Sequence, residues 1–335
     1  MNSDEHAPPS RVLSVQPTQQ CNAECDHCGS FSNPRVKVAL EPALAEDAIR
    51  QAAREGYKDV VFTGGEPTLS GRWLLSAFAL AKSLGFFVRL ATNGWWAKTP
   101  QIAAQRVREF VDAGLDEVEF STGDQHARFV PLAAVIRGSL AAMEIGLRVT
   151  VIIELVKTRV ISKEEFMVLP EILEARAAFP NAVLNVHQSP WMPIKPDNTE
   201  QYPYGVAVHK GNVARRGGCS DIIGTTTISP DGTISACCGI GMRLIPELQL
   251  GNIAETSIAE AVRKAESDPL KQWIRSAGPE NILAWASTHD PTIEWEHMYG
   301  HRCQACIRMY TDPKVRQVLR DHRKDGPLGS PAARE

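Results

Sequence analysis

The sequence lacks the features that mark membrane, exported and nucleic-acid-binding proteins. Its 335 residues contain no apolar run of about 18 residues, the length that a membrane-spanning helix needs. Residues 1–11 are polar and include Pro8 and Pro9, which is unlike a signal peptide. A formal net charge of -3 leaves no basic excess for a nucleic-acid footprint. These absences predict a cytoplasmic protein that acts on neither membranes nor nucleic acids.

Cysteine is also scarce, and its distribution is uneven. None of the 8 cysteines lies between Cys28 and Cys219. Because cytoplasmic thiols stay reduced, we expect metal ligands rather than disulfides. The two groups are Cys21, Cys25 and Cys28, and then Cys219, Cys237, Cys238, Cys303 and Cys306. This split predicts two metal centres in two structural regions.

The first group is Cys21-Asn22-Ala23-Glu24-Cys25-Asp26-His27-Cys28. A loop this short can direct three thiolates at one inorganic centre. Three thiolates do not close a structural zinc site, which normally has four nitrogen or sulfur ligands. They suit a cubane iron–sulfur cluster whose fourth iron stays open.

Strands and helices alternate over the first half of the chain. We expect strands at 11–16, 59–63, 86–91, 115–120, 148–156 and 182–186, and helices at 42–55, 72–84, 101–113, 132–145 and 163–178. This β(αβ)₅ order predicts a parallel sheet flanked by helices. Right-handed crossovers allow an open doubly wound sheet or a partial barrel.

Polar motifs follow nearly every expected strand. In both architectures, sites form where the carboxyl ends of the strands meet. We therefore expect these motifs to converge on one pocket. They are the cysteine loop, Gly64-Gly65-Glu66-Pro67, Thr92-Asn93-Gly94, Ser121-Thr122-Gly123-Asp124 and His187-Gln188.

The pattern changes after Pro190. Pro193, Pro196 and Pro203 indicate a linker, and Pro230-Asp231-Gly232 indicates the turn of a β-hairpin. Helices are expected at 252–264, 269–274 and 281–288. The predicted organisation is a disordered start (1–10), an α/β domain (11–190), a linker (191–218), a small α+β domain (219–322) and a disordered tail (323–335).

The cysteine loop after the first strand, followed by Gly64-Gly65-Glu66-Pro67 after the second, resembles the radical S-adenosylmethionine (SAM) superfamily. The resemblance implies a partial (β/α)₆ TIM-like barrel. It implies a [4Fe-4S] cluster on Cys21, Cys25 and Cys28, with SAM chelating the open iron. In that family, a reductant such as flavodoxin or ferredoxin supplies the electron that cleaves SAM. The resulting 5′-deoxyadenosyl radical abstracts a hydrogen atom from the substrate.

The resemblance also implies cofactor contacts. Gly64 and Gly65 would let the backbone approach the methionine moiety, Glu66 would accept a hydrogen bond from its ammonium group, and Pro67 completes the motif. Further expected contacts are Asn93, Ser121, Asp124 and Glu154. Several have simpler readings, since Asn-Gly is common in turns and Glu154 suits a surface position. Ser121 to Asp124 also departs from the family's Ser-x-Asp-Gly form. His27 resembles a residue that hydrogen-bonds a cluster sulfur.

The later cysteines resemble the auxiliary-cluster domain called SPASM, or its shorter form, twitch. The resemblance implies one auxiliary [4Fe-4S] cluster on Cys219, Cys237, Cys303 and Cys306. A Cys₄ zinc site with the same ligands is the alternative. Cys238 is left over, either as a hydrogen-atom donor to a substrate radical or as a small buried hydrophobe.

The substrate is the least determined feature. His187 and Gln188 are the preferred substrate contacts, because they are expected to end the sixth strand. Relatives with this layout mostly crosslink, epimerise or oxidise ribosomally made peptides, and others oxidise or epimerise small molecules. The short segment before the first strand predicts that a separate protein delivers any peptide. A non-catalytic iron–sulfur or zinc scaffold is the alternative from another class.

Overall fold

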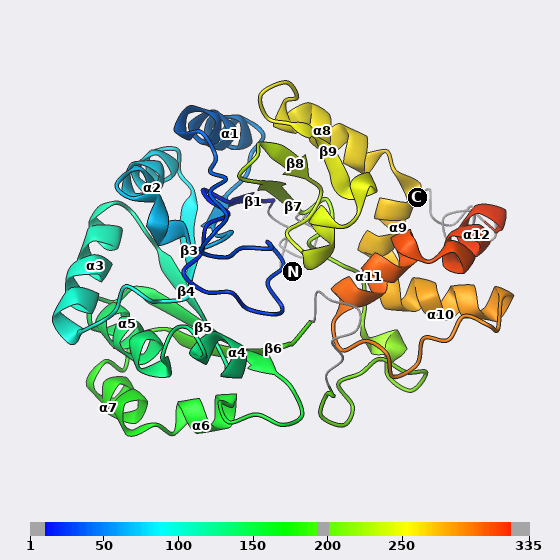
Figure 1. The fold of residues 1–335 in the computed structure, drawn as a ribbon. Helices are drawn as coiled ribbons and strands as arrows, with labels where there is room; N and C mark the ends of the chain where they lie inside the picture. The colour runs from blue at the N-terminus through cyan, green and yellow to red at the C-terminus, as the bar shows by residue number, and fades with distance from the viewer. Residues whose placement is uncertain (1–10, 193–200, 323–335) are drawn as a thin grey trace, which may run out of the picture.

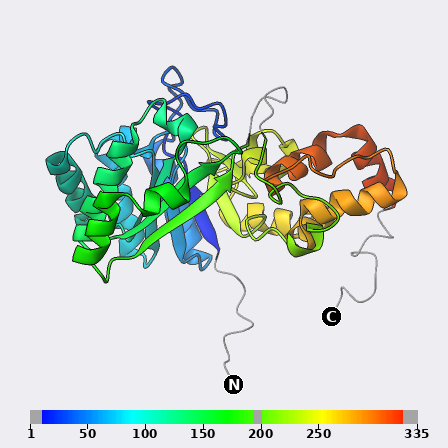
Figure 2. The ribbon, with the colours of Figure 1, turned by 90° about the horizontal axis from the view of Figure 1, so that it is seen from below.

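The computed structural model describes residues 11–192 and 201–322. The disorder expected at 1–10 and 323–335 lies outside these residues. A single nine-stranded sheet in the order β6-β5-β4-β3-β2-β1-β7-β8-β9 organises the described chain. Helices cover the outside of the curved sheet, and the C-terminal helices lie beside it (Figures 1 and 2).

The N-terminal part is the expected partial (β/α)₆ barrel. Its six strands are parallel: β1 (Val12–Val15), β2 (Asp59–Phe62), β3 (Phe87–Thr92), β4 (Glu117–Thr122), β5 (Arg148–Leu155) and β6 (Leu184–Pro190). The helices between them are α1 (Pro42–Arg54), η1 (Pro67–Ser70), α2 (Trp73–Ser83), α3 (Pro100–Asp112), α4 (Asp124–Ala127), α5 (Leu132–Glu144), α6 (Lys163–Met167) and α7 (Pro170–Ala178).

Two expected bounds in this part are wrong. The single helix expected at 163–178 is two helices, α6 and α7. Leu169, directly before Pro170, has an extended backbone (φ -58°, ψ 135°), because a proline ring disfavours helical geometry in the preceding residue. The sixth strand runs to Pro190 instead of ending at 186, so His187 and Gln188 lie within β6.

The C-terminal region continues the barrel sheet. Its strand β7 (Thr225–Ile228) pairs in parallel with β1, from Val12↔Thr225 to Val15↔Ile228. The hairpin partner β8 (Thr233–Ser235) and then β9 (Gln249–Asn252) add antiparallel strands. The remaining elements are η2 (Val213–Arg215), η3 (Ile240–Arg243), η4 (Pro246–Leu248), α8 (Ile258–Glu266), α9 (Pro269–Ala277), α10 (Pro279–His289), α11 (Arg302–Thr311) and α12 (Pro313–Asp321).

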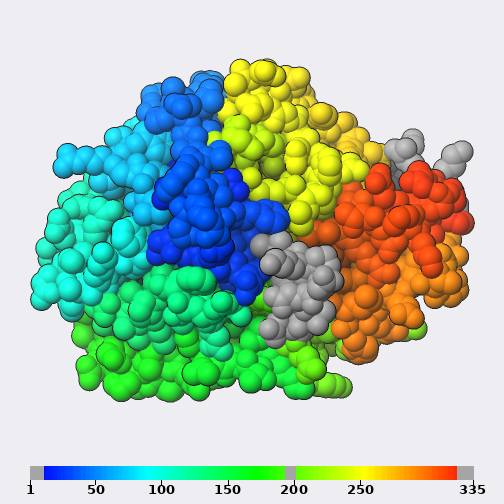
Figure 3. All heavy atoms as spheres, viewed as in Figure 1, coloured from blue at the N-terminus to red at the C-terminus, as the bar shows by residue number. Residues whose placement is uncertain are grey.

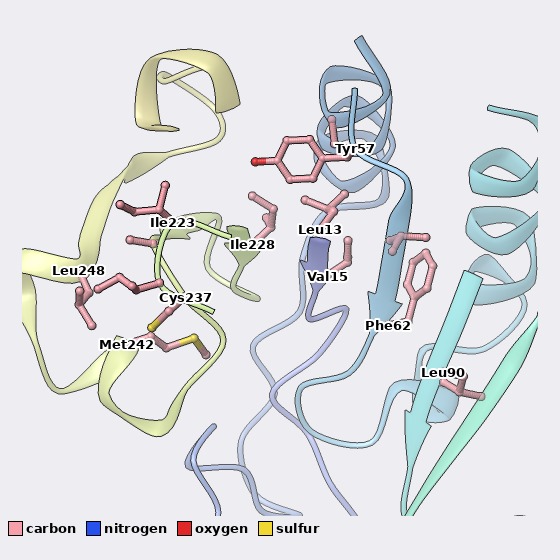
Figure 4. Close-up of a cluster of buried hydrophobic side chains, with 14 of the residues drawn as sticks. Leu13, Val15, Tyr57, Phe62, Leu90, Ile223, Ile228, Cys237, Met242 and Leu248 are labelled. Carbon is pink, nitrogen blue, oxygen red and sulfur yellow. The ribbon is translucent and has the colours of Figure 1, made fainter. Parts of the chain in front are cut away.

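One hydrophobic core joins the two regions. Leu13 and Val15 of β1 and Ile228 of β7 are all 0% exposed. Figure 4 shows them between Phe62 on the barrel side and Cys237, Met242 and Leu248 on the C-terminal side. Apolar burial of this kind stabilises the β1–β7 junction. The position of the second cysteine group therefore depends on the barrel.

No helix among the described residues combines the length and apolar character needed to cross a membrane.

Candidate functional site

The three N-terminal cysteines lie on the loop that follows β1, at the carboxyl ends of the barrel strands. Cys21, Cys25 and Cys28 line one cavity, together with the ends of β2, β3 and β4. In Figure 3 this loop (blue) lies on the molecular surface between the barrel and the C-terminal region. The predicted convergence of strand-end motifs therefore holds for the loops after the first four strands.

The sulfurs have protein donors around them. The Ala23 amide is 3.4 Å from Cys21 Sγ, and the Ser32 amide donates to Cys28 Sγ at 3.3 Å. Burial raises the pKa of the Cys21 thiol to about 12, so the thiol is neutral at pH 7 unless a bound metal stabilises its thiolate. Three converging sulfurs with amide donors suit a ligand set for an iron–sulfur cluster.

Gly64 and Gly65 bring the loop after β2 against the cysteine loop. A Cβ on Gly65 would lie 2.2 Å from the Gln20 carbonyl oxygen, so only glycine fits there. Gly64 has φ 113°, which is unfavourable for other residues. The Gly65 amide donates to the Thr18 carbonyl and the Glu66 amide to that of Gln20, each at 2.9 Å. Both glycines line the cavity, as a cofactor-binding cradle requires.

Glu66 is fully buried and ties the ends of β2 and β3 together. Its Oε1 accepts from the Thr68 amide (3.2 Å), the Thr68 hydroxyl and the Thr92 hydroxyl (2.8 Å). Its Oε2 accepts from the Asn93 amide at 2.9 Å. Burial raises the pKa of Glu66, and these hydrogen bonds oppose the rise. Glu66 and Pro67 lie behind the cavity lining, and Oε2 is the oxygen with acceptor capacity left for a ligand.

Asn93 and Ser121 lie in the lining itself. The side-chain Nδ2 of Asn93 donates to Asn22 Oδ1 at 2.9 Å and lies 3.7 Å from Cys21 Sγ. Asn93 therefore joins the end of β3 to the cysteine loop. A direct contact between either residue and a cofactor stays a prediction.

Glu154, at the end of β5, lies between two histidines. Its Oε1 is 3.3 Å from His27 Nε2 and is hydrogen-bonded to His126 Nδ1, and its Oε2 accepts from the Gln125 amide at 2.9 Å. Burial favours a higher pKa for Glu154, but the bonds from His126 and Gln125 outweigh it and lower the pKa. His27 thus contacts a carboxylate, and its hydrogen bond to a cluster sulfur stays a prediction.

Burial determines the protonation state of His27 in this arrangement. Burial, with the nearby His126, lowers the pKa of His27 to about 4, so His27 is neutral at pH 7. Its Nε2 lies 3.3 Å from Glu154 Oε1, and its buried Nδ1 has no described hydrogen-bond partner. Both His27 and His126 line the cavity. These three side chains could hold a divalent cation, yet Glu154 is already well supplied with hydrogen bonds without one.

Three predicted residues lie away from the cavity lining. Asp124 accepts from the Val160 and Ile161 amides, each at 2.9 Å, and so fixes the segment after β5. In β6, His187 pairs with Ile152 and Gln188 pairs with Ile153. His187 is exposed, and the Gln188 Nε2 is buried without a described partner. The predicted roles of these residues stay predictions.

The C-terminal cysteines form a second group. Cys219, Cys237, Cys303 and Cys306 line one cavity with the apolar residues Ile222, Leu248 and Ile274. Burial raises the pKa of the Cys303 thiol to about 12, which again calls for a metal. Cys238 is exposed and outside this lining. The cavity therefore contains the four sulfurs chosen from the sequence. No three of them lie within 4.8 Å of one another, a spacing that suits a cluster better than a single zinc ion.

Comparison with known families supports the same division. The model of the radical SAM superfamily matches residues 15–167. The SPASM iron–sulfur cluster-binding domain matches residues 219–283. The chain therefore contains a radical SAM domain followed by a SPASM iron–sulfur domain.

Radical SAM relatives of several kinds are similar to it. YydG of Bacillus subtilis, named as a peptide biosynthesis protein, is 24% identical over 127 residues, 38% of this chain and 40% of YydG. The GTP 3′,8-cyclase of a Synechococcus strain is 34% identical over 145 residues, 42% of this chain and 40% of the cyclase. The chain thus spans well under half of either relative.

The fold is also found in a solved radical SAM structure. Streptococcus suis SuiB, crystallised with SAM, superposes with a TM-score of 0.57 at 17% identity, over 80% of this chain and 68% of SuiB. At this identity the likeness establishes the fold alone.

A radical SAM domain implies a [4Fe-4S] cluster with SAM, and a SPASM domain implies auxiliary clusters. The residues present fit both groups. Cys21, Cys25 and Cys28 would hold the first cluster beside the Gly64–Gly65 cradle. Cys219, Cys237, Cys303 and Cys306 would hold an auxiliary cluster.

Sequence reasoning missed a serine pair behind the first centre. The Ser30 hydroxyl donates to the Gly64 carbonyl at 2.7 Å, and it lies 3.3 Å from Cys28 Sγ and 2.8 Å from the Ser32 hydroxyl. Both serines are buried. Their only signal in the sequence is their position directly after Cys28. Trp191 is buried beside His27, with ring centroids 6.0 Å apart.

Proposed function

We propose that this radical SAM enzyme abstracts a hydrogen atom from a residue of a ribosomally made peptide, which it crosslinks, epimerises or oxidises. When bound and reduced, the cluster with SAM supplies the 5′-deoxyadenosyl radical. The remaining steps depend on the residues of this chain. The observation that carries the proposal is the cavity that Cys21, Cys25 and Cys28 share with Gly64 and Gly65.

The chain's own residues have distinct tasks in this proposal. Gly64 and Gly65 leave space for the cofactor beside the cysteine loop. Glu66 holds the ends of β2 and β3 in position through the Thr92 hydroxyl and the Asn93 amide. His126, held by Glu154, presents its second ring nitrogen for hydrogen bonding at the cavity. Asn93 and Ser121 are the further proposed cofactor contacts.

The second centre takes part after hydrogen abstraction. An auxiliary cluster on Cys219, Cys237, Cys303 and Cys306 would accept the electron that a substrate radical loses on oxidation. The β1–β7 junction supports this role, because one sheet holds both cysteine groups in a fixed relation. A flavodoxin or ferredoxin would reduce the first cluster, and a separate protein would deliver the peptide.

The names of relatives support a peptide substrate without excluding a small molecule. YydG is named for peptide biosynthesis, and SuiB was crystallised with its precursor peptide SuiA. The similar GTP 3′,8-cyclase is named for a nucleotide substrate. A radical SAM dehydrogenase or epimerase of a small molecule is therefore the second candidate.

A mass-spectrometric assay distinguishes the two candidates. The anaerobically reconstituted enzyme is incubated with SAM, dithionite and a short peptide encoded beside its gene. A change in peptide mass that requires SAM supports peptide modification. If no neighbouring peptide changes while GTP or a cyclitol alcohol is converted, the peptide proposal is wrong.

A further inference from the structure

An arginine of the C-terminal region reaches the N-terminal cysteine loop. Arg243, the last residue of η3, donates from Nη2 to Gln16 Oε1 at 3.2 Å. Gln16 directly follows β1, and its Cβ lies next to the Gly64 cradle. At the other end of η3, Ile240 packs on Gly29, where an added Cβ would come within 3.3 Å of Ile240. The helix therefore contacts residues on either side of the cysteine loop in sequence, Gln16 before it and Gly29 after it.

The guanidinium of Arg243 is only partly compensated by the protein. Arg243 is half-buried, and its Nε is buried without a described hydrogen-bond partner. Its hydrogen-bond partner Gln16 is neutral, and no carboxylate of the described residues forms an ion pair with it. A buried positive charge is costly unless an anion or good hydrogen-bond acceptors offset it. A nearby anion would therefore stabilise Arg243 even without a direct ion pair.

Two anionic groups act on Arg243. Burial lowers the pKa of Arg243, while Asp231 and Cys28 oppose that change. Asp231 lies on the exposed turn of the hairpin, where water screens its charge. Cys28 is part of the cavity lining, where charges are screened less. Asp231 has the larger effect on the pKa of Arg243, but the less screened centre at Cys28 is the counter-charge that a bound cluster would make more negative.

We infer that Arg243 is a positioning residue that stabilises the reduced state of the cluster held by Cys21, Cys25 and Cys28. This inference rests on the proposed cluster ligation. Reduction adds one electron and so makes the centre more negative. A nearby fixed cation favours that state, since net charge and hydrogen bonding set the reduction potentials of such clusters. The C-terminal region would in this way tune the centre that begins the reaction.

A redox titration followed by electron paramagnetic resonance tests the inference. Anaerobically reconstituted wild type, Arg243→Gln and Arg243→Lys are compared without SAM, and the signal that shifts when SAM is later added identifies the first cluster. For Arg243→Gln we expect the reduced-to-oxidised ratio at a fixed potential to fall roughly tenfold, which is a midpoint about 59 mV more negative. Arg243→Lys should retain most of the wild-type value.

Arg35→Gln is the matched control. Arg35 lies on the loop that follows β1 and pairs with Glu24. Its side chain is 71% exposed, so water should screen the effect of removing its charge. Equal iron content and equal circular dichroism spectra show that each variant is folded and loaded. A wild-type midpoint in Arg243→Gln overturns the inference, as does an equal shift in Arg35→Gln. A weaker SAM affinity with an unchanged SAM-free midpoint also overturns it, because Arg243 would then bind the SAM carboxylate.

The titration needs neither substrate nor turnover. A shifted midpoint in a protein that forms no product would leave the inference intact and count against the proposed function alone.

Discussion

The two cysteine centres differ in the number of thiols and in what surrounds them. The first has three cysteines in a cavity with polar neighbours, among them His27, Asn93 and Ser121. The second has four, surrounded by Ile222, Leu248 and Ile274. Three thiols leave a coordination position for a ligand, whereas four complete the site. The first centre is thus suited to chemistry and the second to electron transfer or structure.

Each centre also depends on the other region. The β1–β7 pairing joins the strand that leads into the first centre to the strand that precedes the second. Changes that disable one centre and spare the other test whether this division of roles is correct. Four tests of this division follow, from the largest expected effect to the smallest.

Cys28→Ala should remove the first cluster and leave the second. Iron should fall from about eight to about four atoms per chain, because each cubane contains four. The electron paramagnetic resonance signal that responds to SAM should vanish. Iron analysis after anaerobic reconstitution measures the loss. An unchanged iron content would contradict ligation by Cys28.

Cys237→Ala and Cys238→Ala distinguish ligand from neighbour at the second centre. Cys237 is buried in the cavity and Cys238 is exposed outside it. Cys237→Ala should lose about four irons, the content of one cubane, and Cys238→Ala should lose none. About four irons in the wild type, with zinc at one per chain, would instead assign the second site to zinc.

Gly65→Ala should disturb the first centre through packing alone. The new Cβ would lie 2.2 Å from the Gln20 carbonyl oxygen, and relieving this overlap should cost about 1–3 kcal/mol of stability. Denaturant unfolding measures the cost, and iron loss should be confined to the SAM-responsive cluster. Gly146→Ala is the control for backbone strain without overlap, because its φ is 78° and nothing lies within 4 Å of its added Cβ. Equal losses of stability and of iron in Gly65→Ala and Gly146→Ala would contradict the claim that only glycine fits at position 65.

Asp268→Ala should weaken the second centre slightly. Asp268 caps α9 through the Leu270 amide (2.9 Å) and pairs with the buried Lys271, and α9 carries Ile274 of the cavity wall. Loss of the cap should cost about 1 kcal/mol. Burial favours a higher pKa for Asp268, but Lys271 outweighs it and lowers the pKa.

The sign of the pH dependence follows from that lowered pKa. The carboxylate of Asp268 stabilises the fold at pH values above its unfolded pKa of 3.8, and this contribution is lost as the pH falls through the folded value. Thermal melting between pH 5 and pH 3 should show a smaller decline for Asp268→Ala than for wild type. Parallel curves would show that the ion pair does not matter.

The sequence predicted the parts that depend on local spacing. The cysteine loop, the Gly64–Gly65 cradle and the four cysteines of the second cavity each follow from residues close together or from a known family pattern. The break between α6 and α7 was not predicted, although Pro170 inside the expected helix marks its position. The short helix α4 and strand β9 were missed, because neither has enough residues for a clear periodic pattern.

Long-range partners could not be predicted. The pairing of β1 with β7 joins residues about two hundred positions apart, and a lone strand does not specify its neighbour. The His27–Glu154–His126 arrangement likewise depends on the meeting of three loops. Glu66 was expected to accept a hydrogen bond from the ammonium group of SAM. Most of its hydrogen-bonding capacity is instead used within the chain.

The most direct test of the division between the centres is the formation of 5′-deoxyadenosine from SAM under anaerobic, dithionite-reduced conditions. The wild type and Cys237→Ala should both form it, whereas Cys28→Ala should form none, because the first centre alone generates the radical. If the wild type with both clusters intact forms no 5′-deoxyadenosine, the account of the first centre is wrong.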